Sequence, residues 1–438
     1  MLALLAFAMV ATFMALIMSG RVSALVALSL TPVVFGVMAG HGLDLGPMML
    51  DGIKALAPTG VMLAFAILYF GLMTDAGLFD PLVRQVVRLA DGDPVRITVG
   101  SAILALAVSL DGDGSTTYLI CCTAMLPLYR RMGLNPLILA CLLMLACGVT
   151  NITPWGGPTA RAASALNLDA GQVFASMAPA MALSGLFIVG VAWLLGRGER
   201  RRLERLSGDG RLHVPDEEVL AIELTRGNDL IERPKLILVN LALTLGLLTC
   251  LVLGLLPIPA LFILATAIAL LINYPSVDAQ KARIAAHAPN ILPVISLIFA
   301  AGIFTGILNG THMTEALADS VVGAIPPALG PYMAPVTALL SMPFTFFISN
   351  DAFFFGVLPV LSEAAGHYGV EPVEMARAAL TSQAVHLLSP LVPSTYLLVG
   401  LCRVELAQHQ KFTLPWAVAL TIVLLAGGIV TGVIPVSG

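Results

Sequence analysis

The sequence predicts an all-helical protein that crosses a lipid bilayer many times. Of its 438 residues, 58% are hydrophobic and only 11% are charged, whereas about 25% of the residues in a soluble domain are charged. Apolar segments of roughly 16 to 22 residues recur from end to end, and a helix needs about 20 residues to span a bilayer. Polar residues interrupt several of these segments, which is typical of transporters built from hairpins and broken helices.

Ten apolar segments are interpreted as membrane-spanning helices. The first segment lacks a basic start and a clear small-residue cleavage site, so we interpret it as a retained helix rather than a signal peptide. Two further regions, 95–128 and 331–366, contain two shorter apolar arms each and are predicted to be re-entrant hairpins. The ten spans are expected at about 2–19, 23–40, 57–76, 134–151, 173–195, 236–256, 258–273, 289–309, 372–388 and 414–434.

Arginine and lysine predict the orientation, because short cytoplasmic loops carry an excess of both residues. The longest polar stretch, 196–235, opens with GRGERRRLERL and is expected to be a cytoplasmic linker between two halves. Ten spans then leave both termini outside, with Lys54 and Arg377 as exceptions to the charge rule. The hairpin at 95–128 is expected to enter from the cytoplasm and the hairpin at 331–366 from the exterior.

The two halves of the chain resemble each other. Five glycine, proline or hydroxyl residues of the first half each have a matching residue in the second half at the same distance along the chain. This constant offset is the one that separates Gly133 from Gly369 and Pro136 from Pro372. Five spans and one hairpin per half would leave the second half inverted relative to the first. Inverted repeats are typical of secondary transporters, whose site lies near mid-membrane where the repeats meet. The predicted repeats are 1–195 and 236–438, with scaffold helices at about 1–90 and 236–325 and a hairpin and broken helix at about 95–195 and 331–438.

Two acidic residues interrupt the first hairpin in the stretch SLDGDGSTT. Each costs at least about 2.5 kcal/mol at the centre of a bilayer, and irregular backbone at this depth must be buried in protein or line a wet cavity. Asp111 and Asp113 are therefore expected to face a cavity and to hold a cation or a proton. The alternative is a tip whose aspartates lie in cytoplasmic water. The adjacent hydroxyl groups of Ser115, Thr116 and Thr117 are candidate ligands.

The second interruption is the stretch TNITPWGGPT, in which two prolines and two glycines break a span. A broken helix frees carbonyl groups for a cation and amide groups for an anion. Arg161 follows one turn later and requires a carboxylate, either from Asp113 or from a substrate. A kink that only shapes packing and an arginine that extends to the interface are the alternatives. The candidate site residues of this stretch are Asn151, Thr153, Gly156, Gly157 and Thr159.

The second hairpin and the last span contain the remaining two interruptions, SNDAFFFG and SPLVPSTY. Asp351 is a third carboxylate for a cation or a proton, and it follows the candidate ligands Ser349 and Asn350. His386, one turn before the last interruption, is interpreted as a hydrogen-bonded core residue rather than a proton carrier. The last interruption matches the second by the same repeat offset and adds Ser389, Ser394 and Thr395 as candidate ligands.

Other classes of protein have little support in the sequence. It contains no GxSxG, HExxH, P-loop or dinucleotide-binding motif, so an enzyme is not expected and ion gradients are favoured over ATP as an energy source. The six cysteines lack CxxC spacing and are interpreted as small packing residues. A net charge of −4 gives no indication of a nucleic-acid partner. A channel and a membrane-bound sensor remain as alternatives to a transporter.

Four stretches together, SLDGDGSTT, NITPWGGPTARAAS, ISNDAFFFGVLPVL and SPLVPSTYLLVG, resemble the citrate–metal symporters of the CitMHS family, within the ion transporter superfamily. The resemblance implies proton-driven uptake of citrate complexed with a divalent cation across a bacterial inner membrane. It also implies an elevator mechanism, in which hairpins and broken helices slide against a scaffold that forms a homodimer. Sodium-coupled dicarboxylate transporters of the superfamily carry Ser-Asn-Thr at both hairpin tips, and the aspartates here depart from that pattern.

These aspartates favour a metal complex as the substrate. Free citrate carries about three negative charges at neutral pH, so three nearby carboxylates would repel it. A divalent cation placed between them reverses the sign of this interaction, and oxygen ligands suit Mg²⁺ or Ca²⁺. Arg161 is then expected to bind a citrate carboxylate, with no permanently bound cofactor. Sodium-coupled transport of a free di- or tricarboxylate is the alternative.

Overall fold

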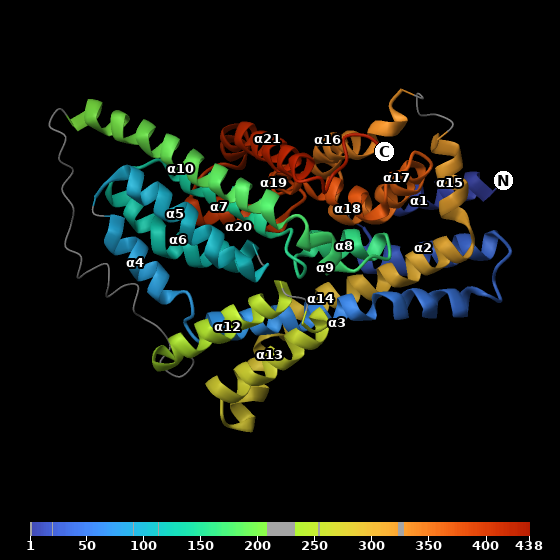
Figure 1. Ribbon diagram of the computed structural model, residues 1–438, viewed down its shortest axis with the longest axis horizontal. Helices are drawn as coiled ribbons and strands as arrows, with labels where there is room; N and C mark the ends of the chain where they lie inside the picture. The colour runs from blue at the N-terminus through green and yellow to red at the C-terminus, as the bar shows by residue number, and fades with distance from the viewer. Residues whose placement is uncertain are drawn as a thin grey trace.

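The protein is an assembly of helices in two layers (Figure 1). The computed structural model describes residues 2–19, 21–90, 92–112, 114–207, 233–252, 255–322 and 328–438, and all regular elements in these ranges are helical. Within these ranges, five helices are long and apolar enough to cross a membrane, namely α3 (Leu45–Asp75), α10 (Ala178–Ser207), α12 (Ile237–Val252) together with the 3₁₀ turn that precedes it from Pro234, α14 (Val277–Gly310) and α21 (Leu406–Val430).

The shorter helices fall into three kinds. Three are apolar helices of one layer: α1 (Leu2–Met18), α2 (Ala24–Met38) and α13 (Ile258–Asn273). Two are amphipathic: α4 (Asp80–Ala90) and α15 (Met313–Val322). The others belong to hairpins or broken helices: α5 (Pro94–Val108), α6 (Gly114–Arg131), α7 (Pro136–Thr150), α8 (Gly157–Ala165), α9 (Ala170–Ala175), α16 (Met333–Phe347), α17 (Leu358–Gly366), α18 (Pro372–Leu380), α19 (Gln383–His386) and α20 (Pro393–Cys402).

Both predicted hairpins have two helical arms separated by a non-helical tip. In the first, α5 and α6 flank Gly112, whose φ of 80° lies in the left-handed region that favours glycine. In the second, α16 ends at Phe347, and the chain re-enters a helix through a π-helical turn at Ala352–Val357 before α17. Such π-helical segments often occur at functional sites.

Several helix boundaries differ from the predicted ones. Helices α3 and α14 begin well before the predicted span starts at 57 and 289, because the helices include charged residues such as Asp51 and Lys54 in α3 and Lys281 and Arg283 in α14 that precede the apolar stretches. Helix α10 continues to Ser207, well into the predicted linker at 196–235. Its ERRRLERL stretch, Glu199 to Leu206, consists of helix-forming residues, and the Arg202–Glu199 pair at 2.7 Å supports the helix. The predicted span at 372–388 is divided into α18 and α19.

The lower layer in Figure 1 is organised around the crossing of α3 and α14. Glycines allow this close approach, because a Cβ atom on Gly52 would overlap the carbonyl oxygen of Gly302 and would lie 2.9 Å from the Cα of Gly306. Helix α2 packs mainly against α14, and α13 packs against α3. This layer is the candidate scaffold.

The other layer contains the hairpins and the broken helices. Helices α5, α6, α7, α10 and α21 share one hydrophobic core with α19 and α20. The second hairpin, α8 and α18 belong to the core that also includes α3 and α14. Parts of both halves of the chain therefore meet in each core.

The helices of the second half follow the same order as those of the first. Each half has two apolar helices, a long helix, an amphipathic helix, two hairpin arms, a broken helix and a final long helix. Helices α7 and α8 begin at Pro136 and Gly157, and their counterparts α18 and α20 begin at Pro372 and Pro393. Both pairs of starting residues are separated by the offset between Gly133 and Gly369, so the secondary structure repeats in step with the sequence.

An ion pair ties the base of the first hairpin to the end of α10. The carboxylate of Asp93 caps α5 by accepting a hydrogen bond from the Val95 amide at 3.0 Å, and Arg200 Nη2 lies 2.5 Å from both of its oxygens. Burial raises the pKa of Asp93. Hydrogen bonds from Arg200 and Val95 and the positive charges of Arg200 and Arg96 lower the pKa by more than burial raises it, so the pKa lies below its ordinary value.

We therefore expect Asp93 to make stability depend on pH. A carboxyl group whose pKa is lowered by folding stabilises the protein above its unfolded pKa of about 3.9, and this contribution disappears as the pH falls through the lowered value. Asp93→Asn is expected to lower the thermal unfolding midpoint at pH 7, with the difference from wild type shrinking below about pH 4. Asp51→Asn, at an exposed pair with Lys54, is the control. A difference that is constant with pH would contradict this assignment.

Candidate functional site

The candidate site is built from four interruptions of helices. We name them the first tip (109–114), the first break (151–156), the second tip (348–351) and the second break (387–392), since each joins two described helices or helical turns. The sequence predicts that they meet at one place, and contacts between them test that prediction pair by pair.

The first tip is held against the first break. The indole Nε1 of Trp155 donates a hydrogen bond to the Leu110 carbonyl at 2.8 Å, and Thr150 Oγ1 donates to Ser109 Oγ at 2.8 Å. At Gly112, a Cβ atom would lie 3.1 Å from the Trp155 ring, tighter than an ordinary contact. The tip therefore needs a glycine for space as well as for its positive φ angle.

The second tip is held against the second break in the same way. Ser389 Oγ donates to the Phe346 carbonyl at 2.7 Å, and His386 Nδ1 donates to the Thr345 carbonyl at 2.8 Å. By the repeat offset, His386 is the counterpart of Thr150. His386 is buried and hydrogen-bonded, as expected for the core residue that the sequence indicated.

The two halves touch at the centre of this arrangement. A Cβ atom on Gly148 in α7 would lie 2.6 Å from the Cα of Ala384 in α19, so these helices cross almost backbone to backbone. Gly148 and Ala384 are themselves counterparts under the repeat offset. A Cβ atom on Gly114 would lie 3.8 Å from Ser394 Oγ at the start of α20, which brings the first tip close to the second half.

An ion pair connects the second tip to the helix that follows the first break. Arg161 Nε in α8 donates to Asp351 Oδ1 at 2.5 Å, and the two side chains are 24% and 16% exposed. The sequence predicts a carboxylate partner for Arg161 from Asp113 or a substrate, and the structure supplies one from Asp351 in the other half. The four interruptions and the helix ends beside them therefore gather in one region of the molecule.

Two sets of polar groups can be distinguished among the candidate site residues. One set is used by the fold: Ser349 Oγ accepts from the Ala352 amide at 3.1 Å, and Ser389 and Thr395 donate to backbone carbonyls. The other set is buried without a hydrogen-bond partner in the described part of the protein. This second set consists of Thr117, Thr153 and Thr159, together with the amide oxygen of Asn350.

The remaining predicted residues lie at the interruptions. Asn151 caps the end of α7 and is partly buried. At Gly156, a Cβ atom would overlap the Asn151 carbonyl, so the backbone of the first break requires glycine there. The following Gly157 begins α8 next to the Arg161 guanidinium. Ser115 and Thr116 in the first turn of α6, and Ser394 in the first turn of α20, are partly buried.

The acidic residues of the first tip are described only in part. The backbone of Asp111 ends a 3₁₀ turn at Ser109–Asp111, while its side chain lies outside the described residues. Asp113 lies outside them altogether. Within the described ranges, no three His, Cys, Asp or Glu side chains come together as metal ligands.

Two site residues were not identified from the sequence. Trp155 packs against Phe70 of α3 and Phe262 of α13, with ring centroids 5.3 and 5.2 Å apart, and so joins the first break to the candidate scaffold. Gln383 accepts a hydrogen bond from Asn350 Nδ2 at 3.2 Å. The sequence contained a feature that could have identified each residue. Trp155 directly precedes the two glycines of the first break, and Gln383 is a polar residue within an apolar segment.

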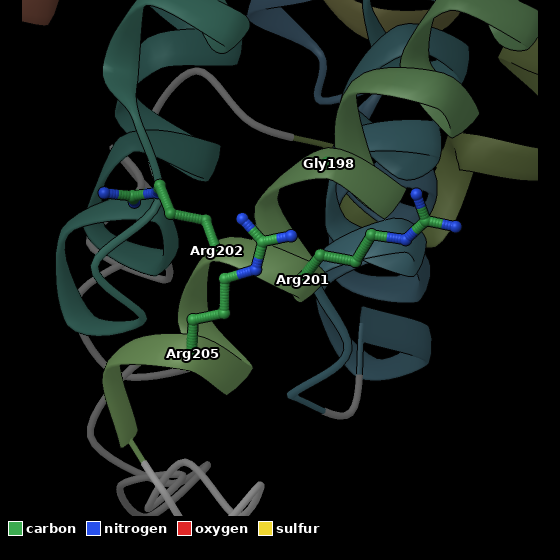
Figure 2. A pocket seen from close by; sticks show the side chains of 4 residues that line it. All are labelled: Gly198, Arg201, Arg202 and Arg205. Atoms are coloured by element: carbon green, nitrogen blue, oxygen red, sulfur yellow. The ribbon is translucent and has the colours of Figure 1, made fainter.

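A cationic surface lies at the far end of α10, away from the four interruptions (Figure 1). Figure 2 shows Arg201, Arg202 and Arg205 beside Gly198, around a hollow of about 530 Å³. Arg202 Nη2 donates to the Gly133 carbonyl, so this surface is anchored to the loop between α6 and α7.

Comparisons with known proteins identify the family. The sequence profile of the CitMHS family, described as citrate transporter, matches residues 7–382. The chain is 54% identical over 434 residues to a Bacillus subtilis (strain 168) protein named citrate transporter, covering 99% of this chain and all of that protein. It is 50% identical over 441 residues to the Mg(2+)/citrate complex secondary transporter of the same strain, with both chains fully covered.

The fold is shared with a solved transporter structure. The YdaH transporter of Alcanivorax borkumensis aligns with a TM-score of 0.59 over 91% of this chain and 90% of its own, at 17% sequence identity. At this identity, the likeness concerns the fold alone, and it confirms the predicted class of all-helical polytopic membrane protein. Since the family profile spans most of the sequence and the relatives align from end to end, the chain belongs to the CitMHS family of citrate transporters.

Proposed function

We propose that this protein takes up citrate as a complex with a divalent metal ion, driven by protons. The observation that carries the proposal is the meeting of four helix interruptions, which places a cationic and an anionic side chain, Arg161 and Asp351, side by side in a partly buried site. The name of the relative with 50% identity, an Mg(2+)/citrate complex secondary transporter, supports the choice of substrate.

Electrostatics favours the complex over free citrate. A divalent cation cancels two of the roughly three negative charges of citrate at neutral pH, so less charge must be taken out of water. Carboxylate, hydroxyl and amide oxygens are the ligands that Mg²⁺ and Ca²⁺ prefer. The unpartnered oxygens of Thr153, Thr159 and Asn350 in the described part of the chain are of this type.

The proposed roles follow from the position of each residue. Arg161 binds a carboxylate of citrate, and the metal ion or the coupling proton is held by Asp351 together with Asp111 and Asp113. The charges of the entering substrate change the electrostatic environment of these aspartates. One aspartate can therefore bind or release a proton during transport, which couples uptake to the proton gradient. The residues proposed to line the site are Ser115, Thr116, Thr117, Asn151, Thr153, Gly156, Gly157, Thr159, Ser349, Asn350, Ser389, Ser394 and Thr395.

We propose that the two halves are inverted repeats and that transport follows an elevator mechanism. The repeated order of helices and the contact between Gly148 and Ala384 support the repeat, because equivalent positions touch at a two-fold axis. The α3–α14 layer would be a scaffold that pairs two copies as a homodimer in the bacterial inner membrane. In Figure 1 both termini lie toward one end of the view and the C-terminal end of α10 lies at the other, which supports the proposed arrangement of outside termini and a cytoplasmic linker.

The metal dependence of uptake tests this proposal. Proteoliposomes with an inward proton gradient are expected to accumulate radiolabelled citrate in the presence of Mg²⁺, and chelation by EDTA is expected to reduce uptake at least about tenfold. An internal pH-sensitive dye should report acidification that accompanies citrate entry. Liposomes without protein are the control. Uptake that survives EDTA but stops when sodium is removed would instead support sodium-coupled transport of the free anion.

A further inference from the structure

We infer that the Arg161–Asp351 ion pair makes the site selective for the assembled metal–anion complex, by requiring that a cation and an anion arrive together. This inference rests on the proposed function, because it concerns how the same site distinguishes the complex from its two parts. It starts from the direct contact between the two side chains, whose Nε and Oδ1 atoms lie 2.5 Å apart.

The pair neutralises two charges in a poorly hydrated place. Arg161 and Asp351 expose only 24% and 16% of their side chains, so an unpaired charge at either position would lose hydration without gaining a partner. A ligand can therefore enter between them only if it offers a partner to each. The short distance leaves no room for a ligand atom unless the pair separates.

The parts of the complex each satisfy one side only. Citrate alone gives Arg161 a carboxylate but leaves Asp351 unpaired beside an anion. Mg²⁺ alone pairs with Asp351 but leaves Arg161 unpaired beside a cation. The complex supplies a metal ion to Asp351 and a carboxylate to Arg161 in a single step. The cost of opening the pair is thus offset for the complex and not for either component.

The pair also joins parts of the two halves of the chain. Asp351 immediately precedes the π-helical turn at Ala352–Val357, and Arg161 lies on α8, which packs against that turn. Because Arg161 belongs to the first half and Asp351 to the second, separating them releases the second tip from α8. The Arg161–Asp351 ion pair would therefore both select the metal–citrate complex and control the opening of the site.

Binding to purified protein in detergent tests the inference without relying on transport. Isothermal titration would use three probes: Mg²⁺ with citrate, citrate with EDTA, and Mg²⁺ without citrate. Wild type is expected to bind the first at least about tenfold more tightly than the other two. Asp351→Asn should bind citrate in EDTA at least about tenfold more tightly than wild type, and Arg161→Gln should gain affinity for Mg²⁺ alone.

A double variant provides a test that does not depend on a buried unpaired charge, which could disturb the folding of either single variant. Arg161→Gln with Asp351→Asn leaves no charge unpaired and is expected to lose the preference for the complex over citrate. The matched control is Asp51→Asn with Lys54→Gln, which removes an exposed ion pair outside the site and should keep the wild-type preference. If wild type binds the complex but the single and double variants retain its metal requirement, this inference is overturned while the proposed function stands. If wild type binds no metal–citrate, the proposed function itself fails.

Discussion

Replacing Gly148 with valine is expected to abolish citrate uptake. The first carbon of any side chain at this position would lie 2.6, 2.8 and 3.0 Å from the Cα, Cβ and amide nitrogen of Ala384. None of these atoms can rotate away, so α7 and α19 must separate where the two broken helices cross. Overpacking typically costs about 1–3 kcal/mol, occasionally more, and here the displacement falls on the site itself. Uptake of labelled citrate in proteoliposomes is expected to fall at least about tenfold.

A reciprocal swap separates the geometry of this contact from general damage. Gly148→Ala is expected to impair uptake, and adding Ala384→Gly should restore much of it, because the pair again has one methyl group at the crossing. Gly190→Val is the control, since a Cβ atom at Gly190 in α10 meets no atom within 4 Å. Near-normal uptake by Gly148→Val would show that the two broken helices do not need this close approach.

Gly52→Val is expected to prevent stable folding rather than to alter the site. A Cβ atom at this position would overlap the carbonyl of Gly302, and a neighbouring backbone atom of α14, the Cα of Gly306, lies 2.9 Å away. Helices α3 and α14 could then no longer pack closely, and the cost is expected to reach or exceed about 3 kcal/mol. Size-exclusion chromatography of detergent-solubilised protein should show loss of the monodisperse peak.

The control for this variant is Gly246→Val in α12, where a Cβ atom meets nothing within 4 Å. It carries the same change of residue in a helix of the same layer and should purify like wild type. Monodisperse Gly52→Val protein with an unchanged unfolding temperature would mean that the α3–α14 crossing can relax, and would remove close packing as the reason for glycine at this position.

Much of the fold could be predicted because the relevant signals are local. Long apolar segments predict spans, and prolines and glycines inside such segments predict interruptions. The offset between Pro136 and Pro372 predicted where the broken helices of both halves begin. The predicted end of the span at 195 was too early, because hydropathy marks where a helix leaves the apolar layer and not where its hydrogen bonding ends at Ser207.

The candidate site could be predicted as a set of stretches but not as a set of contacts. Local polarity marked Arg161 as a residue that needs a carboxylate, yet Asp351 belongs to the other half of the chain and reaches it only through packing of the two halves. The same limit applies to Gly148, which has no special φ angle and needs to be glycine only because Ala384 faces it.

The sequence by itself determined the class of protein, the positions of the four interruptions and the family, because hydrophobic length, helix-breaking residues and motif identity are properties of consecutive residues. The tertiary structure alone decided which polar groups become partners and, among the described residues, which hydroxyls the backbone uses and which stay unpaired. Those outcomes depend on how rigid helices pack, and packing is set by distances between segments that are far apart along the chain.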